Sequence, residues 1–127
     1  MKIPTNMTDE NSLAMLGVQA VQLLCAGDIP ALVARFGYAL ALGREIESAL
    51  SQDLLRCLTE LHAKKLVGTG QQFSPEVNFF KENSTSLFAV VTCLVPTDNG
   101  ACILLELVVT SVDSEKHITL EQLSVAA

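Results

Sequence analysis

The sequence feature that most constrains the fold is a long apolar stretch from Ser86 to Val112, interrupted once by the segment PTDNG. The stretch is rich in Val, Ile, Leu, Thr and Phe, the residue types that suit a pleated and partly buried strand. The pair Asn99-Gly100 in the interruption is typical of the tight type I′ turn that joins two antiparallel strands. We therefore predict a β-hairpin at the centre of the fold.

The register of this hairpin follows if Asn99 and Gly100 are its two turn residues. The paired residues are then Val95 with Leu104, Cys93 with Glu106, and Val91 with Val108. One face collects Phe88, Val90, Thr92, Leu94, Ile103, Leu105, Leu107 and Val109. Both faces are largely apolar, although an antiparallel sheet commonly exposes one face to water. We expect helices on one face and a second copy of the chain on the other, so that the protein is a homodimer through its outer sheet face.

Helical patterns occupy the N-terminal half. Thr8 or Asp9 is a suitable N-cap for a helix that runs to about Cys25, and Asp28 is a suitable N-cap for a second helix with Pro30 in its first turn. The clearest helix is predicted over residues 44–64. Its apolar stripe consists of Ile46, Ala49, Leu50, Leu54, Cys57, Leu58 and Leu61.

Residues 36–43 allow two interpretations. They could continue the second helix, since Ala and Leu favour helix, or form a short strand bracketed by Gly37 and Gly43. We prefer the short strand. Further strands are predicted over residues 75–81 and 117–125, with a flexible connector over residues 67–70.

Together these elements predict an α+β fold, with three N-terminal helices packed on a curved antiparallel sheet of four to five strands. Residues 1–8 are expected to form a flexible arm, and residues 9–127 a single domain.

Amino-acid composition limits the kinds of partner that the protein is expected to bind. The net charge is −6 and the eight Lys and Arg residues are scattered, so we expect no nucleic-acid partner. The longest apolar run falls short of the roughly 18 residues that span a bilayer, so we expect a cytoplasmic protein without membrane contact. The four cysteines fall singly on apolar segments, and we interpret them as buried thiols, with neither a metal site nor a cofactor.

The segment AVQLLCAGDIPALVARF followed by GREIESALSQDLLRCL resembles the nuclear transport factor 2-like superfamily, also called ketosteroid-isomerase-like or cystatin-like. The resemblance covers residues 11–125. It implies a cone-shaped α+β barrel with a cavity between helices and sheet, and homodimers formed through the outer sheet face. Members of the family include isomerases, dehydratases and binding modules, so the fold does not by itself imply one activity.

The chain departs from the catalytic set of the ketosteroid isomerases that it resembles. Those enzymes use a Tyr in the first helix, an Asp after the second helix and an Asp on a late strand. The first helix here has no Tyr, the segment after the second helix offers Tyr38 but no carboxylate, and the nearest late-strand acid is Glu106. On the preferred register Glu106 faces away from the cavity.

Three residues are candidate catalytic groups, each with a structural alternative. Tyr38 could donate a hydrogen bond to a ligand carbonyl, and the structural alternative is a ring that only packs in the fold. His62 could act as an acid or base, and the structural alternative is a charge that interacts favourably with the helix dipole. Glu106 is a partner across a dimer interface or a carboxylate with a raised pKa. The candidate ligand-binding residues are Tyr38, Phe36, Asn78, Phe80, Phe88 and Leu105. For Asn78 the structural alternative is a polar side chain on the solvated side of an edge strand.

Three functions remain open from the sequence. The first is a dimeric domain whose apolar cavity binds a small hydrophobic or amphipathic molecule. The second is an isomerase or dehydratase that uses Tyr38 with His62 or Asn78, and the third is a module that binds other proteins through its sheet.

Overall fold

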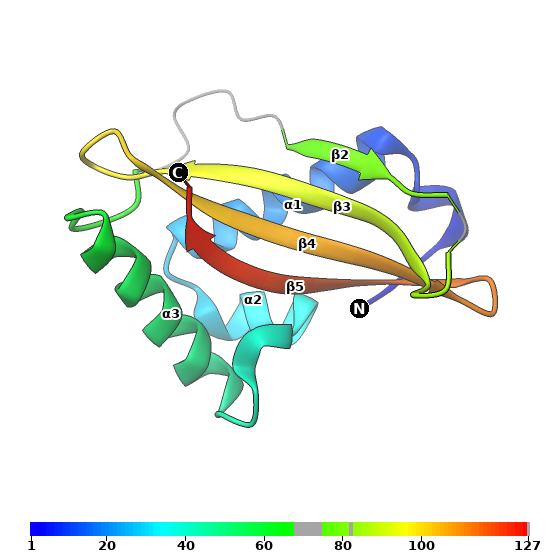
Figure 1. Cartoon of the computed structure of the whole chain (residues 1–127), viewed down its shortest axis with the longest axis horizontal. Helices are drawn as coiled ribbons and strands as arrows, with labels where there is room; N and C mark the ends of the chain where they lie inside the picture. The colour runs from blue at the N-terminus through cyan, green and yellow to red at the C-terminus, as the bar shows by residue number, and fades with distance from the viewer. Residues whose placement is uncertain (68–74, 82, 127) are drawn as a thin grey trace.

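The computed structural model describes residues 1–67, 75–81 and 83–126. Three α-helices lie on one side of a curved antiparallel sheet, as Figure 1 shows, and the predicted α+β class is confirmed. The helices are α1 (Glu10–Cys25), α2 (Ile29–Phe36) and α3 (Ile46–Glu60), with short 3-10 helices η1 (Thr5–Met7) and η2 (Ala39–Ala41). The strands are β1 (Lys2–Ile3), β2 (Glu76–Phe79), β3 (Leu87–Pro96), β4 (Cys102–Val112) and β5 (Glu115–Val125), in the order β1-β5-β4-β3-β2.

The helix boundaries follow from capping chemistry that is visible in the sequence. Asp9 accepts hydrogen bonds from the backbone N–H of Ser12 at 3.2 Å and from its hydroxyl at 2.6 Å, and Asp28 accepts from the N–H of Ala31 at 3.2 Å. Gly27 ends α1 in a left-handed conformation with φ of 74°. Both predicted caps at Asp9 and Asp28 are therefore confirmed.

The register predicted for the hairpin is wrong by one residue. Val95 pairs with Ile103, Cys93 with Leu105, and Val91 with Leu107. The cause is the loop, which has three residues instead of two.

Two hydrogen bonds define this loop. The N–H of Thr97 donates to the Ala101 carbonyl at 2.8 Å and the N–H of Gly100 donates to the Thr97 carbonyl at 3.3 Å, while Gly100 has φ of 88°. This is the three-residue hairpin loop with a left-handed glycine. The two-residue turn with positive φ is found instead between β4 and β5, at Asp113 and Ser114, whose φ angles are 52° and 67°.

The corrected register decides which side chains face the helices. The β4 residues of the inner face are those predicted. On β3, the residues that face the helices are the ones that were predicted to face away from them. The inner face consists of Ala89, Val91, Cys93, Val95, Ile103, Leu105, Leu107 and Val109, all with 0% exposure. Leu94, predicted to lie inside, is 53% exposed on the outer face. Helix α1 approaches this inner face closely at Gly17, where an added Cβ would lie 3.0 Å from Val91 Cγ1.

The short strand predicted at residues 36–43 is also wrong. The segment contains η2, and Leu42 adopts a left-handed conformation with φ of 52°. Helix α3 begins at Ile46 because the Glu45 carboxylate accepts from the N–H groups of Glu47 and Ser48, at 2.6 and 3.3 Å. Arg44 therefore lies outside the helix.

The β3–β4 loop is joined to the C-terminal end of α3. The Asn99 amide donates to the carbonyl of Leu61 at 2.8 Å, and the Asp98 carboxylate accepts from the N–H of Lys64 at 3.0 Å. The bond from Asn99 satisfies a carbonyl that the C-terminal end of α3 leaves without a helical partner.

The N-terminal residues differ from the expected flexible arm, because Lys2–Ile3 pairs with His117 and Lys116 of β5. The connector predicted at residues 67–70 lies, apart from Val67, outside the described residues. Within the described part of the chain, every helix is too short or too polar to cross a bilayer.

Candidate functional site

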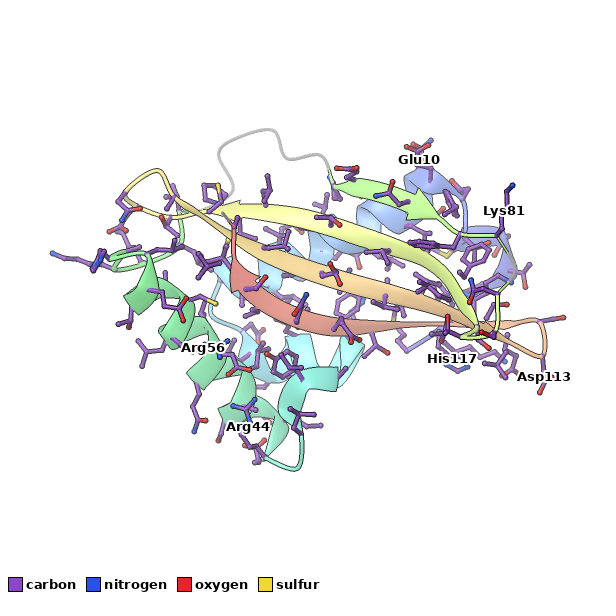
Figure 2. The ribbon with its side chains drawn as sticks, viewed as in Figure 1. Glu10, Arg44, Arg56, Lys81, Asp113 and His117 are labelled. Carbon is purple, nitrogen blue, oxygen red and sulfur yellow. The ribbon has the colours of Figure 1, made fainter. Side chains whose placement is uncertain are left out.

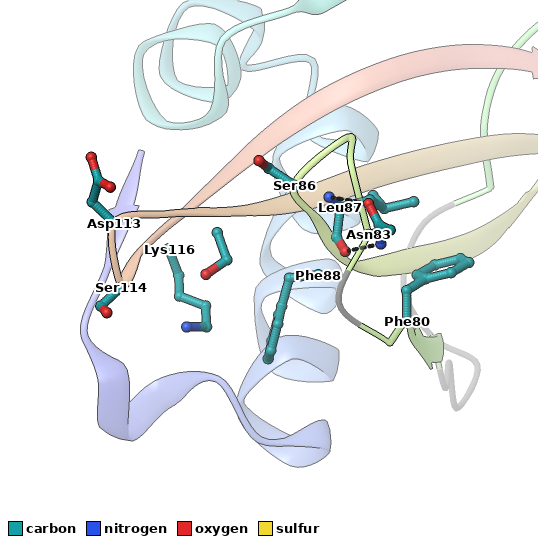
Figure 3. A pocket seen from close by; sticks show the side chains of 9 residues that line it. Phe80, Asn83, Ser86, Leu87, Phe88, Asp113, Ser114 and Lys116 are labelled. Carbon is teal, nitrogen blue, oxygen red and sulfur yellow. Dashed lines mark hydrogen bonds between the residues drawn. The ribbon is translucent and has the colours of Figure 1, made fainter.

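A surface pocket of about 490 Å³ opens at the end of the sheet that is remote from the β3–β4 loop. It lies between the β2–β3 connection and the β4–β5 turn, as Figure 3 shows. Its lining residues are Phe80, Asn83, Ser86, Leu87, Phe88, Ser111, Asp113, Ser114 and Lys116.

Backbone and amide hydrogen bonds fix the wall formed by the β2–β3 connection. The Asn83 amide donates to the carbonyls of Lys81 and Leu87, at 2.8 and 3.0 Å, and its oxygen accepts from the N–H of Leu87 at 3.2 Å. The Ser86 carbonyl accepts from the N–H of Ser111 at 2.8 Å, which joins this wall to β4. The Asn83 side chain is thus occupied in holding the loop.

Aromatic rings form the apolar part of the pocket. The strand pairing shifts between Leu87 and Ala89, so that Phe88 occupies a bulge and packs against the core beside the inner residues. Phe79 meets the Phe88 ring edge to face, with ring centroids 5.6 Å apart. Phe80 is 44% exposed and lines the pocket.

Lys116 supplies the positive charge of the pocket. Its Nζ lies 4.8 Å from the centroid of the Phe88 ring, and Figure 3 shows both side chains on the same side of the sheet. The strand partner of Lys116 in β1 is Ile3, which is 3% exposed, so this side is the helix-covered side. An ammonium over an aromatic face is attracted by the ring quadrupole.

The two acidic side chains near Lys116 do not pair with it: Glu115 is paired with other residues, and Asp113 points away. Glu115 contacts Lys2 at 3.1 Å and His117 at 3.6 Å, and the hydrogen bond from Lys2 holds the pKa of Glu115 below its ordinary value. Asp113 lines the rim, and its carboxylate points away from Lys116 in Figure 3.

A second polar cluster lies between α3 and the segment that precedes it. The Tyr38 hydroxyl donates to the Asp53 carboxylate, and Arg44 donates to both carboxylate oxygens, at 3.1 and 3.0 Å. Arg44 also donates to the carbonyls of Ala41 and Leu40, both at 2.9 Å. Figure 2 shows Arg44 at the start of α3, far from the labelled Asp113 and His117 at the pocket end of the sheet.

Burial and charge shift the pKa values in this cluster. Tyr38 and Asp53 are each 5% exposed. Burial, then the hydrogen bond to Asp53, raises the pKa of Tyr38 well above 10.0. The hydrogen bonds from Arg44 lower the pKa of Asp53 below 3.8, against the effect of burial.

These shifts have opposite consequences for stability. The Asp53 contribution is complete above its ordinary pKa and is lost as the pH falls through the lowered value. The Tyr38 contribution is complete below pH 10 and is lost as the pH rises further.

Sequence reasoning found Tyr38 but missed Asp53. The available signal was its position on the apolar face of α3, four residues after Ala49 and four before Cys57, both of which are buried. A carboxylate among buried side chains requires charged or hydrogen-bonding partners. Arg44 and Tyr38 are those partners.

The remaining predicted residues are dispersed. Phe36 and Leu105 are core residues with 1% and 0% exposure, so of the predicted ligand-binding set only Phe80 and Phe88 line the pocket. Asn78 is exposed on β2, where its amide donates to Glu76 at 3.3 Å. Glu106 is half-buried and lies on the outer face, opposite to Leu105, as predicted.

His62 follows the end of α3 and adopts a left-handed conformation with φ of 56°. It is exposed, and seven helical residues, about 10 Å at 1.5 Å per residue, separate Asp53 from Glu60, where α3 ends before His62. The structure therefore does not bring His62 together with Tyr38.

The described residues contain no group of three or more His, Cys, Asp or Glu side chains suited to hold a metal ion. All four cysteines are free. Cys57 and Cys93 are buried, and burial raises the pKa of Cys93 to about 12, so this thiol is unreactive in the native state.

Comparisons with known proteins found no match: no family model, no curated protein and no solved structure is significantly similar to this chain.

The Tyr38 cluster can be tested by alkaline titration. Tyr38 is the only tyrosine and the chain has no tryptophan, so the ultraviolet absorbance of tyrosinate reports this phenol alone. We predict that Tyr38 in the native protein ionises above pH 10 because it is buried against the Asp53 carboxylate. Asp53→Asn removes the negative charge and lowers the pKa towards its ordinary value.

Glu60→Gln, which removes an exposed charge from the same helix, is the control and leaves the titration unchanged. Circular dichroism recorded in parallel confirms that the fold persists at each pH. Ionisation of native Tyr38 at its ordinary pKa would contradict the proposed network.

Proposed function

We propose that this domain binds a small amphipathic molecule in the pocket between the β2–β3 connection and the β4–β5 turn. The observation that carries the proposal is the combination of Phe88, Phe80 and the Lys116 ammonium around one opening of about 490 Å³. Small-molecule sites commonly have volumes of roughly 300–1,000 Å³, apolar walls and a few polar groups that orient the ligand.

The enzyme hypothesis receives less support. Tyr38 and Asp53 are nearly inaccessible, and their hydrogen-bonding groups are satisfied by each other and by Arg44. A general acid or base must reach the proton of a bound substrate. The Tyr38 cluster is best explained as a connection that holds the segment before α3 against the helix.

We also propose membership of the nuclear transport factor 2-like superfamily. Three helices followed by an antiparallel meander support it. The segment between α2 and α3 differs from the family pattern, because η2 occupies the place of the expected strand.

The outer face of the sheet supports a second proposal, self-association. The helices lie on the opposite side of the sheet (Figure 1), and Leu94 on this face is 53% exposed. The outward positions of β3 and β4 add apolar side chains at Val90, Leu104 and Val108. Thr92 and Glu106 lie between these apolar pairs, and exposed apolar side chains on an uncovered sheet are typical of a protein interface. We propose that a second copy of the chain covers this face, which makes the protein a homodimer.

The ligand proposal is tested by NMR titration of isotope-labelled protein with naphthamide, a neutral aromatic probe. We expect amide shifts concentrated in residues 83–88 and 111–116. Phe80→Ala, which removes an exposed ring from the pocket wall, weakens binding because apolar contact is lost. Leu55→Ala removes an exposed side chain from α3 and leaves binding unchanged.

Phe88→Ala is a second pocket variant with the same expected effect. Shifts at the outer sheet face, or an absence of shifts at accessible probe concentrations, would refute the proposed site.

The dimer proposal is tested by sedimentation. We expect the natural chain to sediment as a dimer and Leu94→Glu to sediment as a monomer, because the substitution places a charge in the interface. Leu55→Glu introduces the same charge on α3, where the side chain is 65% exposed, and leaves the dimer intact. A natural chain that stays monomeric at high concentration would exclude this mode of association.

A further inference from the structure

The polar side chains of the pocket are three serines, Asn83, Lys116 and the rim residue Asp113, whose carboxylate points away from Lys116 in Figure 3. Hydroxyls of Ser86, Ser111 and Ser114 line the pocket and form no side-chain hydrogen bonds within the described part of the chain. The one amide in the lining, that of Asn83, is occupied by the loop. Hydroxyls and an ammonium together are suited to receive an acceptor that carries negative charge.

The Lys116 ammonium is available to such an acceptor. Across the described ranges no carboxylate lies within 4.0 Å of its Nζ, and its neighbour Glu115 is paired with Lys2 and His117. Its close contact is the Phe88 ring, at 4.8 Å from Nζ to centroid. A cation held over a ring retains donors that point away from the ring.

The distance between charge and apolar surface sets the shape of the ligand. Nζ lies 4.8 Å from the centre of the Phe88 ring, and an anion bound to the donors that point away from the ring lies farther from the ring than Nζ does. A ligand that binds Lys116 and also contacts the Phe88 ring must therefore carry its apolar part close to its anionic group. A flat ring that bears a carboxylate directly meets this requirement and can contact Phe88 or Phe80.

We propose that the pocket selects compact aromatic carboxylates over neutral aromatic molecules of the same shape. One carboxylate oxygen accepts from Lys116, the other accepts from the hydroxyl of its strand partner Ser111, and the ring packs against Phe88. This inference rests on the proposed function, because it names the ligand class of the same pocket.

Naphthoate and naphthamide form a matched pair that separates charge from shape. NMR or calorimetric titration at low salt is expected to show about fivefold tighter binding of naphthoate, the size of a partly exposed ion pair. Lys116→Met removes the charge and keeps the apolar stem, so the preference for naphthoate disappears while naphthamide binding is retained. Lys116→Arg keeps the charge and retains the preference for naphthoate.

Each outcome of this experiment is decisive. Equal binding of the two probes to the natural protein, or an unchanged preference in the folded Lys116→Met variant, would overturn the inference and leave the ligand pocket standing. Binding of neither probe would overturn both proposals. If Lys116→Met does not fold, Lys116→Gln replaces it, with the same expected loss of preference.

Discussion

Burial of one face of the β3–β4 hairpin against the helices is the interaction on which the rest of the structure depends. Eight side chains of these two strands have 0% exposure, and each large aliphatic one contributes roughly 1.5–3 kcal/mol when fully buried. A slip of one residue would turn every β3 side chain to the other face. The register is therefore strongly determined, and it fixes what each end of the hairpin can do. One end meets α3 through Asn99, and the other forms the pocket around Phe88.

The two polar clusters differ in how their hydrogen bonds are satisfied. In the Tyr38 cluster every charged or donating group has a partner inside the chain, and such a network fixes local structure. In the pocket, the Lys116 ammonium has no carboxylate within 4.0 Å among the described residues, and its strand partner Ser111 lines the same opening. This contrast, more than the identity of any residue, separates a structural cluster from a candidate ligand site.

Local chemistry made much of the fold predictable. Asp9 and Asp28 each precede a helical pattern. The hairpin is indicated by two runs of strand-favouring residues on either side of a turn sequence. The register was not predictable because Asn-Gly fits both a two-residue and a three-residue loop. In the observed three-residue loop Asn99 bonds to Leu61, a contact 38 residues away in the sequence that a local pattern does not signal.

The same reasoning explains what was missed in the candidate sites. Two glycines around a short apolar run suggested a strand at residues 36–43, but Arg44, which donates to the Leu40 and Ala41 carbonyls, holds this segment as a turn. Phe88 was assigned to the inner side together with Val90, Thr92 and Leu94. It alone faces that way, because a bulge that the sequence does not signal rotates it.

The central claim is the register of the hairpin, since the core and the pocket both follow from it. The most direct measurement is the set of backbone nuclear Overhauser effects between β3 and β4. The structure predicts contacts that place Cys93 opposite Leu105 and Val91 opposite Leu107. Contacts that place Cys93 opposite Glu106 would contradict the account, because Glu106 would then share a face with the buried residues of β3.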